Sequence, residues 1–192
     1  FLLQKDYKWE FDRKIKNKKI KFPIVIKPIN EGSSLGVFIC KNRTQFIKNY
    51  KKLKNEYDRI LVEEYIPGKE IQVAVMGNKA LGAIELVPRR EFYDYTAKYS
   101  ASAKTKHIMP ALLSQKKYKE VLMLARKAHK LLGCRGVTRS DFRFSQNKFY
   151  LLETNTQPGM TKLSLVPEIA NYCGIKFEDL VSWMVKDASS NR

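Results

Sequence analysis

The chain has 192 residues, of which 44% are hydrophobic, and 37 Lys and Arg residues against 19 Asp and Glu residues give a formal net charge of +18. A chain of this length can bury a sizeable core, either as one domain or as two small lobes. It has no apolar run long enough to cross a bilayer and no signal-peptide pattern, so we expect neither a membrane protein nor a secreted one. Its three cysteines fit no zinc or redox motif and are typical of a reducing cytoplasm.

The positive charge raises nucleic acid as a possible partner. The basic residues are mostly Lys and are dispersed along the chain, without a recognition-helix pattern, a zinc finger or an aromatic RNA-binding signature. We therefore expect no nucleic-acid partner, and some of the charge could instead steer an anionic substrate. The chain begins at Phe1 and not at Met, which we interpret as a sign that upstream sequence is missing.

The first predicted elements form a hairpin with a glycine-bearing tip. Residues 24–27 and 37–40 are short β-rich runs, and residues 30–36 form the loop that connects them. A helix is expected from a cap at Asn42 or Thr44 to about Tyr57. The apolar residues expected on one face of this helix are Phe46, Ile47, Tyr50 and Leu53.

Three further strands are predicted before the middle of the chain. Residues 60–62 form a buried-looking strand, residues 70–76 have the alternating pattern of a strand, and residues 79–87 form the next strand after a turn. The alternation puts Ile71, Val73 and Val75 on one face. Residues 88–105 then form a long aromatic loop, for which we expect a function.

The rest of the chain is predicted to hold a long helix, a hairpin and two short helices. The helix starts at Ser114 or Gln115, and Gly133 follows it where a left-handed residue ends a helix. The hairpin covers residues 136–144 and 149–153, and the short helices cover residues 165–172 and 177–185. Because hairpins dominate the pairing, the predicted fold class is α+β with largely antiparallel sheets.

The loop of residues 31–36 offers backbone N–H groups and hydroxyls to an anion, and Lys27 stands at the end of the strand before it. A tight turn without a ligand is the alternative. The strand that ends in Glu63 and Glu64 could contact a purine through its exposed backbone, and a nearby carboxylate such as Glu70 could hold ribose hydroxyls. Neither pattern is specific alone.

Two carboxylates, Asp141 and Glu153, lie on consecutive strands of the last hairpin. A two-residue turn at residues 146–147 would pair Asp141 with Leu152 and put the carboxylates on opposite faces. A three-residue loop would place Asp141 opposite Glu153, and a bound divalent cation would then relieve their repulsion. Asn155 would add a third oxygen, and Arg139 shares a strand face with Asp141. A cation site and a surface salt-bridge ladder both remain open.

The two histidines give no metal motif. His129 lies among lysines on the long helix, so we expect it to be solvated on the surface, and we assign no role to His107.

Several motifs follow one another along the chain: Ile26-Lys27-Pro28, Glu31-Gly32-Ser33-Ser34-Leu35-Gly36, Val62-Glu63-Glu64, Gly68-Lys69-Glu70, Phe92–Tyr99, Arg139-Ser140-Asp141, Leu151–Thr161 and Ser164-Leu165-Val166-Pro167. From about Lys21 to the C-terminus, these motifs in this order resemble the D-alanine–D-alanine ligase family of ATP-grasp enzymes. The loop around Tyr93-Asp94-Tyr95 and Lys98-Tyr99, together with the stretch from Glu153 to Thr161, makes the resemblance specific to this family.

The resemblance implies an ATP-grasp fold with two α+β lobes, residues 1–65 and 66–192, that hold ATP between them. It also implies the following nucleotide contacts by position: Lys27 and Lys98 with phosphate, Glu63 and the backbone of Glu64 and Ile66 with adenine, and Glu70 with ribose.

The resemblance assigns the remaining residues to metal and substrate. Two Mg²⁺ or Mn²⁺ ions would be held by Asp141, Glu153 and Asn155. Arg139 would stabilise the charge of the acyl-transfer intermediate, and Ser33 and Tyr99 would share a hydrogen-bond network on the substrate side. Ser164 and the backbone of Leu165 would bind the carboxylate of the second D-alanine.

The implied reaction uses ATP to convert one D-alanine to D-alanyl phosphate, which the amine of a second D-alanine attacks to give D-alanyl-D-alanine for peptidoglycan synthesis and the cell wall. It would take place in the cytoplasm, with no membrane partner and with a homodimer as a possible assembly. Leu163 stands where the family often carries His, and the family's N-terminal domain is expected to be missing, to be supplied in cis or in trans. The alternatives are an incomplete nucleotide-binding fragment of a ligase and another ATP-grasp carboxylate–amine ligase.

Overall fold

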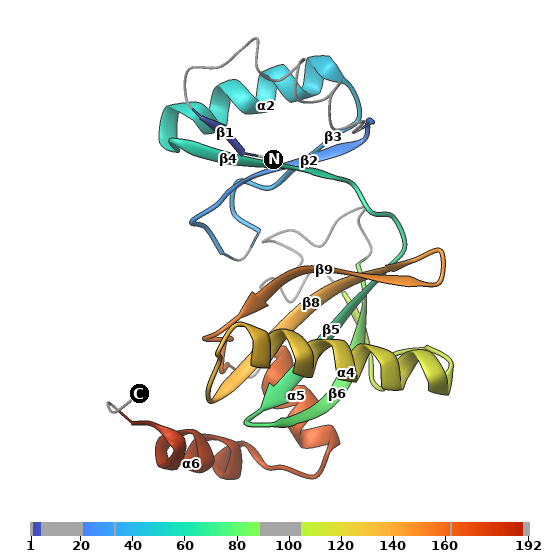
Figure 1. Cartoon of the computed structure of the whole chain (residues 1–192), viewed down its shortest axis with the longest axis vertical. Coiled ribbons are helices and arrows are strands. Elements are labelled where there is room, and N and C mark those ends of the chain that lie inside the picture. The colour runs from blue at the N-terminus through green and yellow to red at the C-terminus, as the bar shows by residue number, and fades with distance from the viewer. Residues whose placement is uncertain (1, 5–20, 33, 89–104, 162, 190–192) are drawn as a thin grey trace. The chain divides into compact units, whose positions relative to one another are not determined.

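The computed structural model describes residues 2–4, 21–32, 34–88, 105–161 and 163–189. Within these residues the chain divides into two compact units, one that ends at Ile66 and one that begins at Pro67 (Figure 1). The functional lobes predicted for residues 1–65 and 66–192 remain a prediction.

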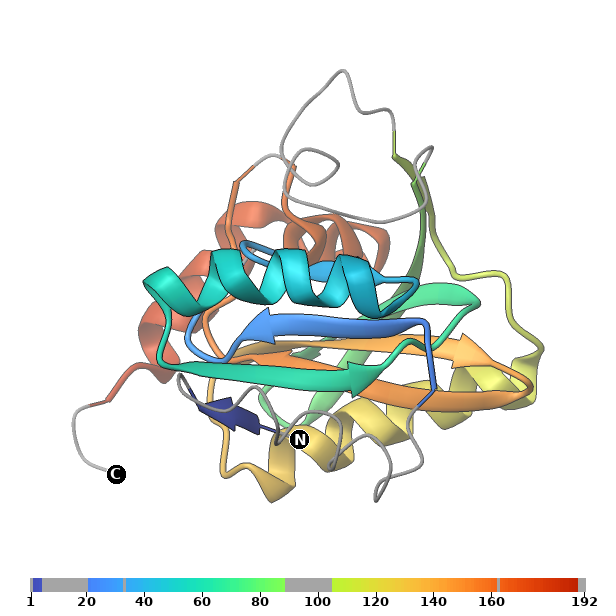
Figure 2. The ribbon, with the colours of Figure 1, turned by 90° about the horizontal axis from the view of Figure 1, so that it is seen from above.

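Where the structure describes it, the first unit is a four-stranded sheet in the order β1-β4-β2-β3, with antiparallel pairing and the helix α2 on one face (Figures 1 and 2). Its elements are β1 (Leu2–Gln4), β2 (Ile24–Pro28), β3 (Phe38–Cys40), α2 (Arg43–Glu56) and β4 (Arg59–Glu64). The predicted hairpin and the predicted helix are both present.

The core of the first unit follows from the two periodicities of its sequence. Ile24 and Ile26 alternate along β2 and are fully buried, and α2 contributes Phe46, Tyr50 and Leu53 to the same cluster. Asn42 caps α2, because its side chain accepts a hydrogen bond from the backbone N–H of Gln45 at 3.0 Å. Ile47, also expected on the buried face, is 39% exposed, since the helix buries a narrower stripe than the one predicted.

The second unit is a five-stranded antiparallel sheet in the order β7-β6-β5-β8-β9. Helix α4 runs along one face, while α5 contacts β5 and β6 on the other (Figures 1 and 2). Its elements are β5 (Lys69–Met76), β6 (Lys79–Val87), β7 (Lys106–Ile108), α4 (Gln115–Leu131), β8 (Val137–Ser145), β9 (Lys148–Asn155), α5 (Leu165–Tyr172) and α6 (Phe177–Asp187).

The main core of the second unit lies between α4 and the sheet. Ile71, Val73 and Val75 of β5 are completely buried against Val121 and Ala125 of α4, as the alternation predicted. The alternate residues of β5, which include Glu70 and Gln72, therefore project from the opposite face. The α+β class with antiparallel sheets is confirmed, and no helix in the described residues is long and apolar enough to span a membrane.

Candidate functional site

The register of the β8–β9 hairpin brings the two predicted acidic ligands together. Gln146 and Asn147 have φ angles of 47° and 62°, and Ser145 pairs with Lys148, which defines a two-residue turn. A regular ladder from this turn would pair Asp141 with Leu152. A β-bulge between Asp141 and Phe142 makes Leu152 an extra residue instead, so that Asp141 lies opposite Glu153. Of the two-residue turn and the three-residue loop that the sequence left open, the structure has the two-residue turn. The prediction that this turn would put the two carboxylates on opposite faces is wrong, because of the bulge.

The bulge completes a line of polar residues across three strands. Gln72 of β5 lies opposite Asp141 of β8, which lies opposite Glu153 of β9. Directly opposite residues of antiparallel strands project from the same face, with their β-carbons about 5 Å apart. We call Gln72, Asp141 and Glu153 the polar row. Since the next residues along β5 and β8, Val73 and Phe142, belong to the core beneath α4, the polar row lies on the face away from α4.

Arg139 forms two hydrogen bonds with Asp141, the central residue of the polar row. Its Nε and Nη2 atoms donate to the two carboxylate oxygens of Asp141 at 2.7 and 2.9 Å, and Asp141 is only 4% exposed. Arg139 itself lies opposite Asn155, whose Nδ2 is 3.5 Å from Oε1 of Glu153. The structure thus brings together four of the residues that the sequence singled out.

The donor set in and beside the polar row fits a hard divalent cation. Asp141 and Glu153 supply carboxylate oxygens, and Asn155 can supply an amide oxygen, which are ligands that Mg²⁺ accepts together with water. Each oxygen of Asp141 keeps one lone pair after it accepts a hydrogen bond from Arg139. Within the described residues, no group of three or more His, Cys, Asp or Glu could hold a metal ion, so such a site depends on the amide and on water or a ligand.

Glu70 lies two residues before Gln72 on β5 and projects from the same face of the sheet as the polar row. Its Oε2 is 3.4 Å from Nη1 of Arg143, its cross-strand partner, and its Oε1 is 3.4 Å from Nε2 of Gln72. The side chain of Glu70 is 11% exposed. It is therefore a largely enclosed acceptor on the same face as Asp141, which suits the predicted contact with hydroxyl groups.

In the first unit, the structure joins two of the predicted nucleotide residues. Nζ of Lys27 lies 2.7 Å from Oε2 of Glu63, and both side chains are partly exposed. They project from the face of the sheet away from α2, because their neighbours Ile26 and Val62 are buried in the core. Glu64 is exposed at the end of β4, and Ile66 is partly buried just beyond it. Lys27 is thus held in place by a carboxylate at the sheet surface.

Ser164 and Leu165 lie at the start of α5. The hydroxyl of Ser164 is 2.9 Å from both the backbone nitrogen and Oγ1 of Thr161, and it makes no capping hydrogen bond to the helix. The side chain of Leu165 is buried, so this residue can offer a ligand only its backbone N–H. First-turn N–H groups of a helix are unsatisfied by the helix itself and favour an anion such as a carboxylate.

The family model described as D-ala D-ala ligase C-terminus matches residues 2–186. The chain belongs to this family. Among curated proteins it is similar to the D-alanine–D-alanine ligase of Pelagibacter ubique (strain HTCC1062), with 63% identity over 179 residues, which cover 93% of this chain and 58% of that protein. The ligase of Paramagnetospirillum magneticum is 48% identical over 173 residues, which cover 86% of this chain and 55% of that protein.

Solved structures of the family have the same fold. The D-alanine–D-alanine ligase of Bacillus anthracis matches 97% of this chain and 60% of its own, with a TM-score of 0.83 and 30% identity. A structure of the Bacillus anthracis ligase complexed with ATP matches 97% of this chain and 58% of its own, with a TM-score of 0.80 and 27% identity. The predicted ATP-grasp fold is confirmed, and the chain spans somewhat more than half the length of these ligases.

Three residues that the ligase resemblance singled out, Ser33, Lys98 and Tyr99, lie outside the described residues. So does most of the predicted functional loop of residues 88–105. Their assignments stay predictions.

His129 is buried, so its predicted position on the solvated surface is wrong. His129 is 4% exposed, its Nδ1 lies 2.8 Å from Oγ1 of Thr138, and burial lowers its pKa. Its spacing of four from Ala125 and eight from Val121 was the signal that it belongs to the buried stripe of α4. Nδ1 of His107 in β7 lies 2.7 Å from Oε2 of Glu168 in α5, a contact between distant segments that no local pattern indicates.

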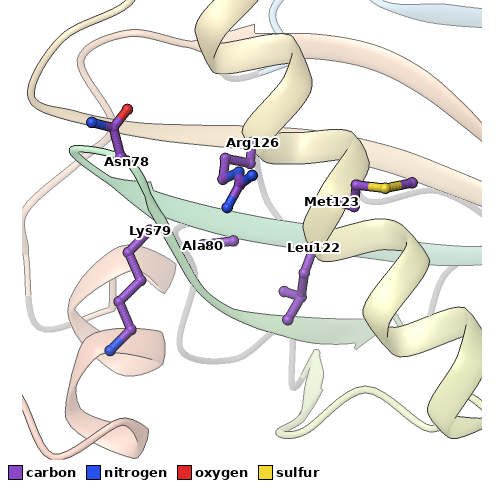
Figure 3. A pocket seen from close by; sticks show the side chains of 6 residues that line it. All are labelled: Asn78, Lys79, Ala80, Leu122, Met123 and Arg126. Carbon is purple, nitrogen blue, oxygen red and sulfur yellow. The ribbon is translucent and has the colours of Figure 1, made fainter.

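The second unit also has a cavity of about 340 Å³ between α4 and the start of β6 (Figure 3). None of the predicted ligase residues lines it. The lining residues are Asn78, Lys79, Ala80, Leu122, Met123 and Arg126. Because this cavity borders α4, it is separate from the polar row, which lies on the opposite face of the sheet.

Proposed function

We propose that this chain is the catalytic part of an ATP-dependent D-alanine–D-alanine ligase that makes D-alanyl-D-alanine through a D-alanyl phosphate intermediate for peptidoglycan synthesis. The observation that carries the proposal is the family match over residues 2–186. The convergence of Asp141, Glu153 and Asn155 on neighbouring strands supports it, because these residues fit the cations that a nucleotide's phosphates require.

In this proposal the nucleotide contacts come from both units. Lys27 and Lys98 bind phosphate, Glu63 and the backbone of Glu64 and Ile66 bind adenine, and Glu70 binds ribose. Asp141, Glu153 and Asn155 hold two Mg²⁺ or Mn²⁺ ions, which when bound would neutralise phosphate charge and orient the phosphates. The 2.7 Å contact between Nζ of Lys27 and Oε2 of Glu63 supports the assignment of both residues to the nucleotide. It places the ammonium group proposed for phosphate and the carboxylate proposed for adenine side by side on the same face of the sheet.

The remaining residues act on the amino acids. The two hydrogen bonds from Arg139 to Asp141 fix the plane of the guanidinium, which is then preorganised to stabilise negative charge that develops during acyl transfer. Ser164 and the N–H of Leu165 bind the carboxylate of the second D-alanine, since the Ser164 hydroxyl is not used as a helix cap. Ser33 and Tyr99 contribute a hydrogen-bond network on the substrate side.

The part of the ligases that this chain does not match is proposed to complete the site for the first D-alanine, in cis or in trans. The chain spans 58% of the length of the Pelagibacter ubique ligase. The proposed setting is the cytoplasm, with ATP and D-alanine as partners and a homodimer as the assembly.

The test measures ADP release with Mg²⁺, ATP and either D-alanine or L-alanine, and identifies the product by mass spectrometry. The assay is run with this chain alone and with the corresponding N-terminal segment of a related ligase added. We expect ADP release to depend on D-alanine and to yield D-alanyl-D-alanine. Release without a preference for D-alanine would indicate another carboxylate–amine ligase, and ATP binding without turnover under both conditions would indicate an incomplete fragment.

A further inference from the structure

Gln72 carries a buried polar atom that has no hydrogen-bond partner within the described part of the chain. The residue is 1% exposed, and its Oε1 accepts no hydrogen bond. Its Nε2 lies 3.4 Å from Oε1 of Glu70 on the same strand. An unmet acceptor in the interior loses its water without compensation, and each such group in a native structure calls for an explanation.

Exchanging the amide nitrogen and oxygen does not remove the problem. The nitrogen faces the carboxylate of Glu70, so an exchange would bring two acceptors together there and would leave the amide hydrogens unmet on the other side. An apolar side chain of similar length would fill the same space without this cost. The amide therefore costs the described fold stability, which points to a partner outside the described residues.

The position of Gln72 indicates what that partner is. Gln72 lies directly opposite Asp141 in the polar row, and Glu153 follows on the next strand. Its neighbour on the other side is Ile84 of β6, which is fully buried and apolar. The polar neighbours of Gln72 along this row thus lie on the Asp141 side, where the proposed function assigns a divalent cation.

We propose that Gln72 positions a hydrated divalent cation by accepting a hydrogen bond from one of the cation's water ligands. This inference rests on the proposed function, which assigns the cation to Asp141, Glu153 and Asn155. Mg²⁺ takes six oxygen ligands and keeps several waters, and these waters are strong donors that need acceptors. Gln72 provides a neutral acceptor beside the carboxylates. It is a positioning residue and does not contact the metal.

The test combines a cation-binding measurement with a stability measurement, and neither depends on turnover. Mn²⁺ alone is the probe, and free Mn²⁺ is measured by electron paramagnetic resonance during a titration with the protein. Thermal unfolding is recorded without metal. The variants are Gln72→Met, which removes the acceptor and keeps the length, and Gln72→Glu, which keeps an acceptor at nearly the same place.

We expect Gln72→Met to weaken Mn²⁺ binding by about tenfold or more, the usual effect of losing an outer contact of a metal site. Its melting temperature without metal should stay the same or rise, because the unmet oxygen is gone. Gln72→Glu should bind Mn²⁺ at least as tightly as the unmodified chain. Thr138→Val, which removes a buried polar partner on the α4 side of the sheet, is the matched control and should lose stability without a change in Mn²⁺ affinity.

Asp141→Asn separates the failure of this inference from the failure of the cation assignment. If Asp141→Asn abolishes Mn²⁺ binding and Gln72→Met leaves it unchanged, the role of Gln72 is overturned and the cation site stands. If the unmodified chain binds no Mn²⁺, or Asp141→Asn binds it equally well, the cation assignment falls and the role of Gln72 falls with it. Loss of Mn²⁺ binding together with a lower melting temperature in Gln72→Met, or loss of Mn²⁺ binding in Gln72→Glu, would show a purely structural role.

Discussion

Arg139 donates to both carboxylate oxygens of Asp141, and only 16% of its own side chain and 6% of that of Asp141 are exposed. Removing the guanidinium would leave a buried carboxylate without its counter-charge. We therefore expect Arg139→Ala to lower the free energy of unfolding by about 3–5 kcal/mol in urea titrations. Adding Asp141→Asn to that variant should restore part of the loss, since the unpaired charge is then removed.

Arg135 provides the matched control for this prediction. It pairs with Asp187 at 3.3 Å, but 48% and 27% of the two side chains are exposed. Arg135→Ala should therefore cost less than about 1 kcal/mol. Equal losses for the two arginine variants would contradict the view that burial makes the Arg139–Asp141 pair important.

Lys27→Met tests the proposed phosphate contact in the first unit. The pair with Glu63 is partly exposed, so its loss should change the free energy of unfolding by less than about 1 kcal/mol. Loss of a charged hydrogen-bond donor to phosphate should weaken ATP binding, measured by isothermal titration calorimetry, by about tenfold or more. Lys51→Met, at an exposed position of α2, removes the same charge and should leave ATP affinity nearly unchanged. Equal effects of the two variants would indicate general electrostatic attraction only.

Gly159→Ala tests the proposed site at the start of α5. A β-carbon at residue 159 would lie 2.9 Å from Oγ of Ser164, which is too close, so the hydroxyl must leave its contacts with Thr161. We expect the KM for the second D-alanine to rise by about tenfold, the effect of losing one hydrogen bond to a charged group, with little change in melting temperature.

The double variant Gly159→Ala/Ser164→Ala decides whether that effect passes through the Ser164 hydroxyl. Once the hydroxyl is gone, the alanine at residue 159 should add little to the KM of Ser164→Ala. Fully additive effects would show that Gly159 acts by another route.

The buried position of His129 should make the free energy of unfolding depend on pH. Burial lowers the pKa of this histidine below its usual value of about 6.5, so the unfolded chain takes up a proton at higher pH than the folded protein does. The free energy of unfolding should therefore fall as the pH is lowered from about 7.5 to about 5.5. His129→Asn, which can keep a hydrogen bond to Thr138 and does not titrate, should show a smaller fall in urea titrations at the two pH values. An identical fall would contradict the prediction.

Gly68 packs against the backbone of the β8–β9 hairpin. Its φ is +111°, and a β-carbon there would lie 2.3 Å from the carbonyl oxygen of Phe144. Gly68→Ala should lower the free energy of unfolding by about 2–4 kcal/mol, because both the backbone angle and the contact oppose the added methyl group. Gly133→Ala also has a positive φ but meets no atom within 4 Å, so it should cost only about 1 kcal/mol in the same measurement.

The elements of the fold were predictable because their patterns are local. The shared face of Ile71, Val73 and Val75, a cap at Asn42 and a helix start near Ser114 follow from patterns among neighbouring residues, and the structure has all three features. Burial along α2 was harder to predict. Ile47 is apolar, as core residues are, but it lies at the margin of the helix face that the sheet covers.

The candidate site shows where local patterns stop being sufficient. Asp141 and Glu153 were predicted as a pair, but the register that joins them depends on an extra residue within β9, which the side-chain pattern does not reveal. Gln72 was only one polar residue of a predicted strand. Its burial beside Asp141 comes from the pairing of β5 with β8, strands that are distant in sequence.

The bulge at Leu152 also matters for how the chain behaves toward other copies of itself. Within the described residues, β9 is an edge strand of its sheet, and Leu151 and Leu152 are 47% and 39% exposed on it. A regular, apolar edge strand is a template on which a foreign strand can add, and such addition begins aggregation. The extra residue interrupts the even spacing of hydrogen-bonding groups along this edge. The same irregularity that places Glu153 opposite Asp141 therefore also makes the strand a poor template for self-association.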